Sequence, residues 1–322
     1  MNVHRPLIER DMKEDKTIGL VADVGGTNTR LAVVGPKGVQ TDTIGRRANA
    51  NFDSFDNLIL DYLATQPVQG RLVVAIAGPV GGRQARLTNR NWVIDADALA
   101  HTCGVQNVTL MNDLEALGQA VPTIAPEAVD ALHSKTTLGQ AGQGLVIGLG
   151  TGFNVSMVDT RSGTVMISEQ GHASLPSSVM DILSAQLPGT SLFSTVEHLF
   201  SGVGLLRLAE VIGVQVDRAE DLVNSDDPRA LDAIDVLTDA LGQMVRELAF
   251  SFFPTAGIYF NGSLAQVLLS PERRARVLAP LRNETGFDGQ FARIPAFLFI
   301  SDTVALGGAA ARLLAEDAAQ RD

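Results

Sequence analysis

Short apolar runs alternate with segments of helical spacing along this chain, and that alternation predicts the α/β class. Runs such as RLVVAIA (71–77) and NVTLM (107–111) are short, apolar and bounded by turn residues, as buried strands are. Residues 231–252 instead repeat their apolar side chains at a period of about 3.6, and Pro254 follows. The sequence therefore predicts sheets covered by helices.

Composition limits the function classes. The chain has 322 residues, longer than one average domain, so we expect one large or two modest domains. Its net charge is −11 and it has no Lys/Arg-rich run, which argues against nucleic acid or an anionic membrane surface as a partner. Cys103 is the only cysteine, so disulfides and Cys-rich metal sites within one chain are excluded. Without a signal peptide or an apolar span, a cytoplasmic location is expected.

The segment GLVADVGGTNTRLAVV (19–34) predicts a strand, a tight turn and a second strand. Paired glycines in such a turn are expected to take positive φ and to leave backbone N–H groups open to an anion. Asp23 is the only charge in the first strand, and a carboxylate beside an anion suits Mg²⁺ on a nucleotide, held through water. An ordinary hairpin is the alternative. The predicted phosphate-binding turn consists of Gly25, Gly26, Thr27 and Asn28.

The next elements follow from turn residues and periodicity. After the turn at 35–38, residues 39–44 are predicted as a third strand, and 52–63 have helical spacing. The apolar run 71–77 ends at Gly78-Pro79, and QARLTNRNWVI (84–94) resembles a hairpin.

Two polar residues, Asn112 and Asp113, separate the strand NVTLM from a helical run at 114–121. Ligands of open α/β sheets bind where a strand's carboxyl end meets the next helix. Either side chain could simply cap the helix, but two candidates in a row leave one for a ligand.

A second hairpin, GLVIGLGTGFNVSM (144–157), repeats the pattern of the first, with Gly150, Thr151 and Gly152 in its turn. Two such hairpins predict two related half-domains that close on one nucleotide. A dinucleotide-binding unit is rejected because a strand, rather than a helix, follows these glycines.

Isolated polar residues in the second half have plain structural explanations as well as functional ones. Glu169 and His172 flank Gly171, and such residues are more often solvated surface. Ser194 and Glu197 fit a capping box at a helix start. Strands are predicted at 258–260 and 297–300, with Asp302 capping a final helix that runs through residue 314. Between them, Asn261 and Gly262 form a turn before a helix, which offers free N–H groups.

Taken together, the ordered segments resemble the bacterial glucokinase family of the hexokinase and actin superfold, from about residue 20 to 314. The resemblance implies a two-domain actin-like ATPase (ribonuclease H-like) fold with the active-site cleft between a small domain (1–113 plus 301–322) and a large one (114–300). The segments that carry it are DVGGTN (23–28), AGPV (77–80), LTNRNW (87–92), NDLEA (112–116), GLGTG (148–152), SEQGH (168–172), VEHLFSGVGL (196–205) and NGS (261–263).

The resemblance implies transfer of the γ-phosphoryl group of ATP to the 6-hydroxyl of D-glucose, with Mg²⁺. Asp113 would be the catalytic base, and the two hairpins with Asn261 and Gly262 would hold ATP. Dimeric relatives suggest a homodimer by analogy. The sugar would contact Asp113 and also Asn112, Asn89, Glu169, His172 and Glu197.

The chain departs from the family's usual Gly or Ala at Asn154 and Asn261, and its SEQGH segment is less Gly-rich. We expect these changes to affect the nucleotide side more than the sugar side. Two alternatives therefore stay open: a kinase for another hexose, and a relative that senses sugar without turnover.

Overall fold

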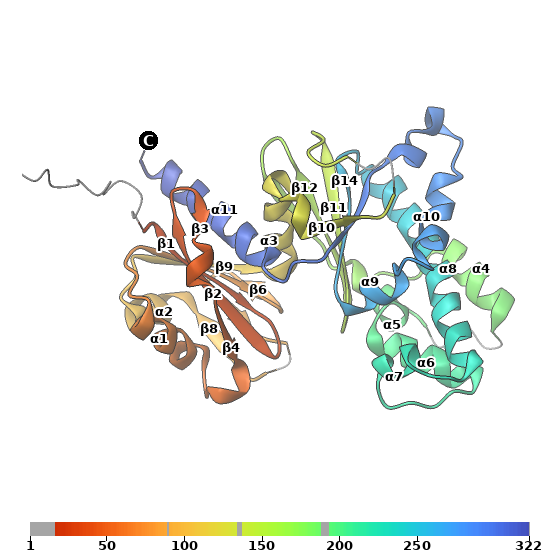
Figure 1. The fold of residues 1–322 in the computed structure, drawn as a ribbon, viewed down its shortest axis with the longest axis horizontal. Coiled ribbons are helices and arrows are strands. Elements are labelled where there is room, and N and C mark those ends of the chain that lie inside the picture. The colour runs from red at the N-terminus through yellow and green to blue at the C-terminus, as the bar shows by residue number, and fades with distance from the viewer. Residues whose placement is uncertain (1–16, 89, 134–136, 188–192, 322) are drawn as a thin grey trace, which may run out of the picture. The chain divides into compact units, whose positions relative to one another are not determined.

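A computed structural model describes residues 17–88, 90–133, 137–187 and 193–321. The chain forms two compact units (Figure 1). Unit 1 comprises Met1–Ala116 and Ala305–Asp322, and unit 2 comprises Leu117–Val304. Each unit is built on one main sheet with helices packed on it, so the α/β class is confirmed.

The main sheet of unit 1 has the strand order β3-β2-β1-β5-β9, with β4 pairing β2. The first two strands form an antiparallel hairpin, and β1, β5 and β9 run parallel. Their bounds are β1 Gly19–Val24, β2 Asn28–Gly35, β3 Gly38–Val39, β4 Gly45–Ala48, β5 Arg71–Ile76 and β9 Asn107–Asn112. A smaller sheet contains β6 Val80–Gly81, β7 Gln84–Arg86 and β8 Val93–Asp95, and β7 and β8 form the predicted hairpin.

Helices cover both faces of this sheet. Helices α1 (Phe55–Thr65) and α2 (Ala96–Cys103) share one apolar cluster with alternate strand residues such as Leu20. Gly19 lies on the opposite face, where an added Cβ would come within 2.9 Å of Leu313 of α11 (Val304–Ala319). Two covered faces explain why the parallel strands are apolar throughout.

The predicted strand at 39–44 is wrong, because pairing ends after Val39 and a 3₁₀ turn follows at Thr41–Thr43. Thr43 explains the early end. Its hydroxyl accepts the N–H of Val33 at 2.9 Å and donates to the carbonyl of Gln40 at 2.6 Å. A side chain thus occupies the position that a longer third strand would have taken.

The sheet of unit 2 repeats the plan of unit 1, in the order β10-β15-β14-β11-β12-β13. Again a central hairpin, β11–β12, continues into two parallel neighbours, β14 and β15. The repeated plan explains why one hairpin motif occurs twice in the sequence. The bounds are β10 Val129–Ala131, β11 Gln143–Leu149, β12 Phe153–Asp159, β13 Thr164–Ile167, β14 Gly257–Asn261 and β15 Ala296–Phe299.

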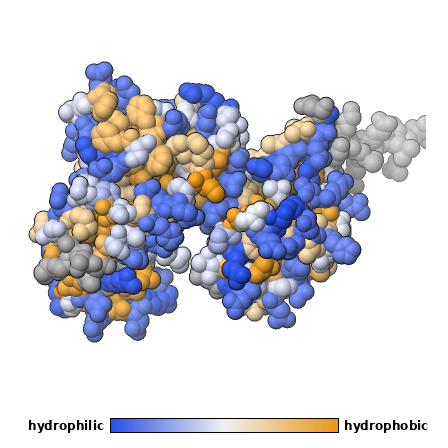
Figure 2. All heavy atoms as spheres, turned by 180° about the vertical axis from the view of Figure 1, so that it is seen from behind, coloured by the Kyte–Doolittle hydropathy of each residue, from blue (hydrophilic) through white to orange (hydrophobic). Residues whose placement is uncertain are grey.

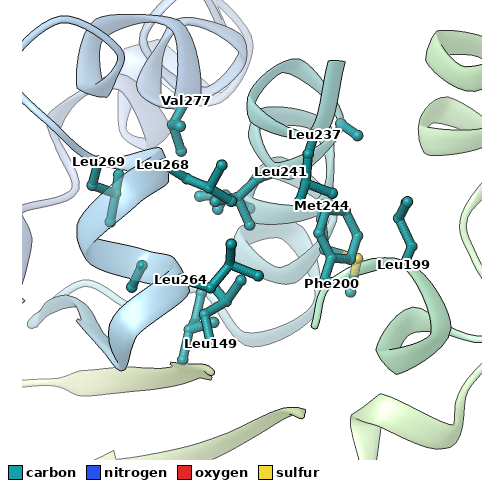
Figure 3. Packing of buried hydrophobic residues seen from close by; sticks show 14 of the residues in the cluster. Leu149, Leu199, Phe200, Leu237, Leu241, Met244, Leu264, Leu268, Leu269 and Val277 are labelled. Carbon is teal, nitrogen blue, oxygen red and sulfur yellow. The ribbon is translucent and has the colours of Figure 1, made fainter. Parts of the chain in front are cut away.

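The core of unit 2 lies between this sheet and the long helix α8 (Pro228–Phe252). Figure 3 shows Leu241 of α8 beside Leu268, Met244 of α8 beside Phe200, and Leu149, at the end of β11, below Leu264. The other helices of this unit are α4 Ser177–Gln186, α5 Val196–Leu199, α6 Gly202–Ile212, α7 Ala219–Val223, α9 Ser263–Leu268 and α10 Arg274–Arg282. Helix α3 (Asp113–Ala120) carries the chain from unit 1 into unit 2.

The face drawn in Figure 2 is mostly hydrophilic on both units, with apolar residues in small groups. Among the described residues, no helix is long and apolar enough to cross a membrane.

Leu241→Ala should lower the free energy of unfolding by roughly 2–5 kcal/mol, because the side chain is fully buried and a cavity would replace it. Leu231→Ala is the matched control on the same helix, since Leu231 is 44% exposed and should change stability by under about 0.5 kcal/mol. Urea unfolding followed by circular dichroism would measure both. Equal losses would contradict this description of the core.

Candidate active site

The predicted site residues of unit 1 gather at one edge of its sheet. Strands β1, β5 and β9 are in register, so that Val24, Ile76 and Asn112 lie side by side. The segments that follow these strands therefore meet at the carboxyl edge, where α/β folds bind ligands. They are the turn at 25–28, the segment 77–80, and Asp113 at the start of α3.

The turn at 25–28 is a tight hairpin in which the N–H of Gly25 donates to the carbonyl of Asn28 at 3.0 Å. Thr27 is exposed at its tip. The expectation of positive φ is wrong for Gly25. A larger residue at this position would crowd the turn, because an added Cβ would lie 3.3 Å from the Asn28 carbonyl oxygen.

Asn49, which the sequence did not single out, holds this turn from behind. It is fully buried, and its amide donates to the carbonyl of Gly25 at 2.8 Å while its backbone N–H donates to that of Thr27 at 2.9 Å. Its Oδ1 accepts the hydroxyl of buried Thr29 at 2.8 Å. These bonds satisfy the turn carbonyls from inside, which leaves the outer side of the turn available to a ligand.

Asp23 and Asp113 form an acidic pair at the same edge. The Asp23 carboxylate accepts from Arg30 Nη1 at 3.2 Å, across the hairpin. Burial, and then the negative charge of Asp23, raise the pKa of Asp113 to about 6. Arg30 was also missed by sequence reasoning, although the hairpin register places it opposite Asp23.

Asn112 is fixed between two backbone groups and so has a structural role. Its amide donates to the carbonyl of Gly78 at 3.1 Å, and its Oδ1 accepts the N–H of Leu114 at 2.9 Å. Asp113 Oδ1 accepts the same N–H at 2.9 Å, so both residues contribute to capping. The expectation that one caps while the other is left for the ligand is therefore too simple.

The segment before Asn89 is tied to the same edge. The backbone N–H and the hydroxyl of Thr88 donate to the carbonyl of Ala77 at 3.2 and 3.0 Å. Gly78 packs so closely that an added Cβ would overlap the carbonyl oxygen of Arg86. Asn89 itself lies outside the described residues.

In unit 2 the two predicted nucleotide-binding turns lie against each other. Gly262 has a φ of 109°, and an added Cβ would overlap the carbonyl oxygen of Leu149, just before Gly150. The carbonyl of Gly150 accepts the N–H of Gly202, the first residue of α6, at 3.0 Å. The turn at 150–152, the turn at 261–262 and the start of α6 therefore form one cluster. Asn261 belongs to it through the register Gly148–Asn261.

This cluster opens into a pocket of about 500 Å³ on unit 2. Its walls are mainly apolar, with amide and hydroxyl groups and the charged side chains of Glu220, Glu272 and Arg273 between them. Such a lining suits a flat heteroaromatic ring and its sugar. The sequence pattern could not predict this pocket, because α6, α7 and α9 come together around it only in the folded structure. Representative lining residues are Gly150, Leu205, Val223, Asn224, Ser263 and Val267.

Glu197 is not part of the predicted capping box. The helix N-cap is Thr195, whose hydroxyl accepts the N–H of His198, while Ser194 bonds the His198 ring. The Glu197 carboxylate instead accepts the N–H of Phe153 at 3.2 Å. It fills the space beside Gly152, where an added Cβ would overlap it. Glu197 is thereby brought next to the second hairpin.

Glu169 and His172 lie exposed at the ends of a short turn. Asn154 connects this turn to β12, because its amide donates to Glu169 Oε2 at 3.0 Å. The Asn154 side chain therefore contacts Glu169, a residue that the resemblance assigns to the sugar, although Asn154 was expected to affect the nucleotide side more. Gly171 packs on Phe153, so the turn also lies close to Glu197.

Among the described residues, no group of three or more His, Cys, Asp and Glu side chains could hold a metal ion by itself. An ion at Asp23 would need ligands from a nucleotide and from water, which is how Mg²⁺ is usually bound. The donor chemistry at Asp23 fits that arrangement, since its carboxylate lies two residues before the turn.

Comparison with known proteins now defines the class, which is the actin-like ATPase fold. Glucokinase from an Antarctic psychrotroph superposes with a TM-score of 0.76 at 23% identity, over 91% of this chain and 98% of that one. The chain belongs to the glucokinase family, whose sequence model matches residues 20–316. It is 30% identical to a glucokinase of Xylella fastidiosa, covering 91% of this chain and 94% of the relative. A Nitrobacter hamburgensis glucokinase is 29% identical, with 92% and 98% covered.

Asp113→Asn should raise the stability of the ligand-free protein at pH 7.5 by up to about 3 kcal/mol. The folded-state pKa of about 6 exceeds the ordinary 3.8, so the folded protein binds more protons between these values. Wild-type stability must therefore fall as pH rises from about 4 to about 6, and the variant lacks this loss. Urea unfolding of both proteins at pH 4.5 and 7.5 would measure the difference, and a constant difference would contradict the raised pKa.

Proposed function

We propose that this protein is an ATP-dependent glucokinase that transfers the γ-phosphoryl group of ATP to the 6-hydroxyl of D-glucose. Family membership supports the reaction class. The observation that carries the assignment of a base is Asp113, a carboxylate with a raised pKa at the carboxyl edge of a parallel sheet. Such perturbed groups mark functional sites in clefts.

Asp113 would take the proton of the sugar hydroxyl as the oxygen of that hydroxyl attacks the γ-phosphorus of ATP. The bond between the γ-phosphorus and the oxygen that bridges it to the β-phosphate would then break, and ADP would leave. A pKa near 6 suits this task, because the carboxylate is mostly ionised at neutral pH yet more basic than an ordinary aspartate. Asn112 lies beside it with its amide fixed, so a second hydroxyl can be recognised in one orientation.

Glucose is an uncharged ring of hydroxyls, so binding it requires several converging donors and acceptors. Asn89, Asn112 and Asp113 of unit 1 would act with the carboxylates and imidazole of unit 2. Closure of the two units over the sugar would exclude water that otherwise hydrolyses ATP. The unit 2 contributors are Glu169, His172 and Glu197.

ATP would lie with its base in the pocket beside Gly150 and Ser263, and its phosphates on the turns at 25–28, 150–152 and 261–262. Bound Mg²⁺ would neutralise phosphate charge, with Asp23 holding it through water. The predicted homodimer completes the proposal, and sedimentation analysis would test it.

A kinase for another hexose remains the competing assignment within this class. A coupled assay with ATP and Mg²⁺ against a panel of hexoses and amino sugars separates the two, because only the true substrate reacts efficiently at low concentration. A protein that binds glucose in calorimetry without consuming ATP would be a sugar sensor instead, and that result would overturn the proposal.

Asp113→Asn should lower kcat by about 10²–10⁴-fold while glucose binding changes little, since the amide keeps the shape but cannot accept the proton. Steady-state kinetics and calorimetry would measure the two effects. Asp42→Asn, a change at an exposed carboxylate, serves as the control and should leave kcat unchanged. A near-wild-type rate for Asp113→Asn would show that another group is the base.

Glu169→Ala and His172→Ala should each raise the KM for glucose at least about tenfold, because each removes one bond to a sugar hydroxyl. The KM for ATP should change less than about twofold. Varying each substrate at saturating levels of the other separates these effects. The reverse pattern would place the sugar elsewhere on the protein.

A further inference from the structure

Asn154, the second residue of β12, uses both ends of its side-chain amide at the turn that carries Glu169. Its Nδ2 donates to Glu169 Oε2 at 3.0 Å. Its Oδ1 accepts the backbone N–H of Gln170 at 3.0 Å and that of Val155 at 2.9 Å. Asn154, which stands where the family usually has Gly or Ala, therefore connects the Glu169 carboxylate, the backbone of the turn at Gln170 and strand β12.

The end of the β12–β13 pairing explains why a side chain is needed here. The ladder extends from Asp159–Thr164 to Ser156–Ile167 and then stops. Beyond Ile167 the chain follows β12 through side chains instead, since Ser168 Oγ donates to the carbonyl of Val155 at 3.1 Å and Asn154 bonds Gln170. The turn at 168–172 is thus attached to β12 by two polar side chains.

Only one of these two attachments reaches the Glu169 carboxylate. Glu169 is exposed, and an exposed glutamate samples several rotamers that must be given up when a ligand binds. A hydrogen bond that fixes one carboxylate oxygen before binding reduces that cost and leaves the other oxygen to accept a hydroxyl.

We propose that Asn154 is a positioning residue of the sugar site, which orients the Glu169 carboxylate for a hydroxyl of the bound hexose. This inference rests on the proposed function, because it assumes that Glu169 contacts the sugar. Asn154 contributes to sugar affinity through the Glu169 carboxylate that its Nδ2 bonds, while its Oδ1 holds the backbone of the same turn. Its effect is on sugar affinity and not on the nucleotide.

A double-mutant cycle on sugar affinity tests the proposal. Calorimetry with glucose, or with the hexose selected by the panel, would compare wild type, Asn154→Ala, Glu169→Ala and the double variant. Asn154→Ala should weaken binding about tenfold, equal to about 1.4 kcal/mol, and should add less than about twofold in the Glu169→Ala background. The KM for the sugar should rise with it, while the KM for ATP stays within about twofold of wild type.

Ser168→Ala is the matched control, because it removes the other attachment of the same turn without touching Glu169. It should change sugar affinity less than about twofold. A second check exchanges the donor and the acceptor of the Asn154–Glu169 hydrogen bond. Asn154→Asp alone places two carboxylates together and should weaken sugar binding. Adding Glu169→Gln to Asn154→Asp restores a donor, and the double variant should bind the sugar more tightly than Asn154→Asp alone. Circular dichroism would confirm that each variant is folded.

Additive losses in the cycle, or equal losses from Ser168→Ala and Asn154→Ala, would overturn the positioning role and leave the kinase assignment intact. Because affinity is measured directly, a wild-type protein that binds sugar without turnover would overturn the kinase assignment while the cycle still decides on Asn154. Failure of wild type to bind any hexose of the panel would overturn both.

Discussion

A turn is held ready to present its N–H groups to a phosphate when its carbonyl groups are bonded from inside the protein. Asn49 meets this constraint in unit 1, where its buried amide and backbone bond the carbonyls of Gly25 and Thr27. An unsatisfied buried carbonyl would cost roughly 1–3 kcal/mol and would favour rotation of the peptide inward. The arrangement of the turn at 25–28 therefore depends on a residue more than twenty positions away along the chain.

Unit 2 meets a similar constraint with different residues. There the turn at 150–152 is fixed by the start of α6 at Gly202 and by the close approach of Gly262. Glycine is required at 262 because the backbone has a positive φ and no space remains for a Cβ. The repeated sheet plan thus supplies two turns that are proposed to bind phosphate, while local contacts determine what each turn faces.

Much of the fold could be predicted because its signals are local. Glycine pairs, strand-length apolar runs and the period of α8 indicate their elements without reference to distant residues. The wrong predictions of secondary structure arise where a side-chain hydroxyl bonds the backbone. Thr43 ends the third strand early, and Thr195 caps α5 where Ser194 was expected. Neither hydroxyl could be assigned a partner from sequence spacing alone.

The candidate site shows the same division. Asn112 and Asp113 were singled out from their place after a strand, and the family resemblance assigned the base to Asp113. The raised pKa of Asp113 depends on burial and on Asp23, which is ninety positions earlier. Asn154 was expected to affect the nucleotide side more than the sugar side. Its side chain bonds Glu169, so under the proposed function it would act on the sugar. A residue's place beside a motif in the sequence therefore does not by itself show which ligand its side chain serves, because side chains along a strand alternate between two faces.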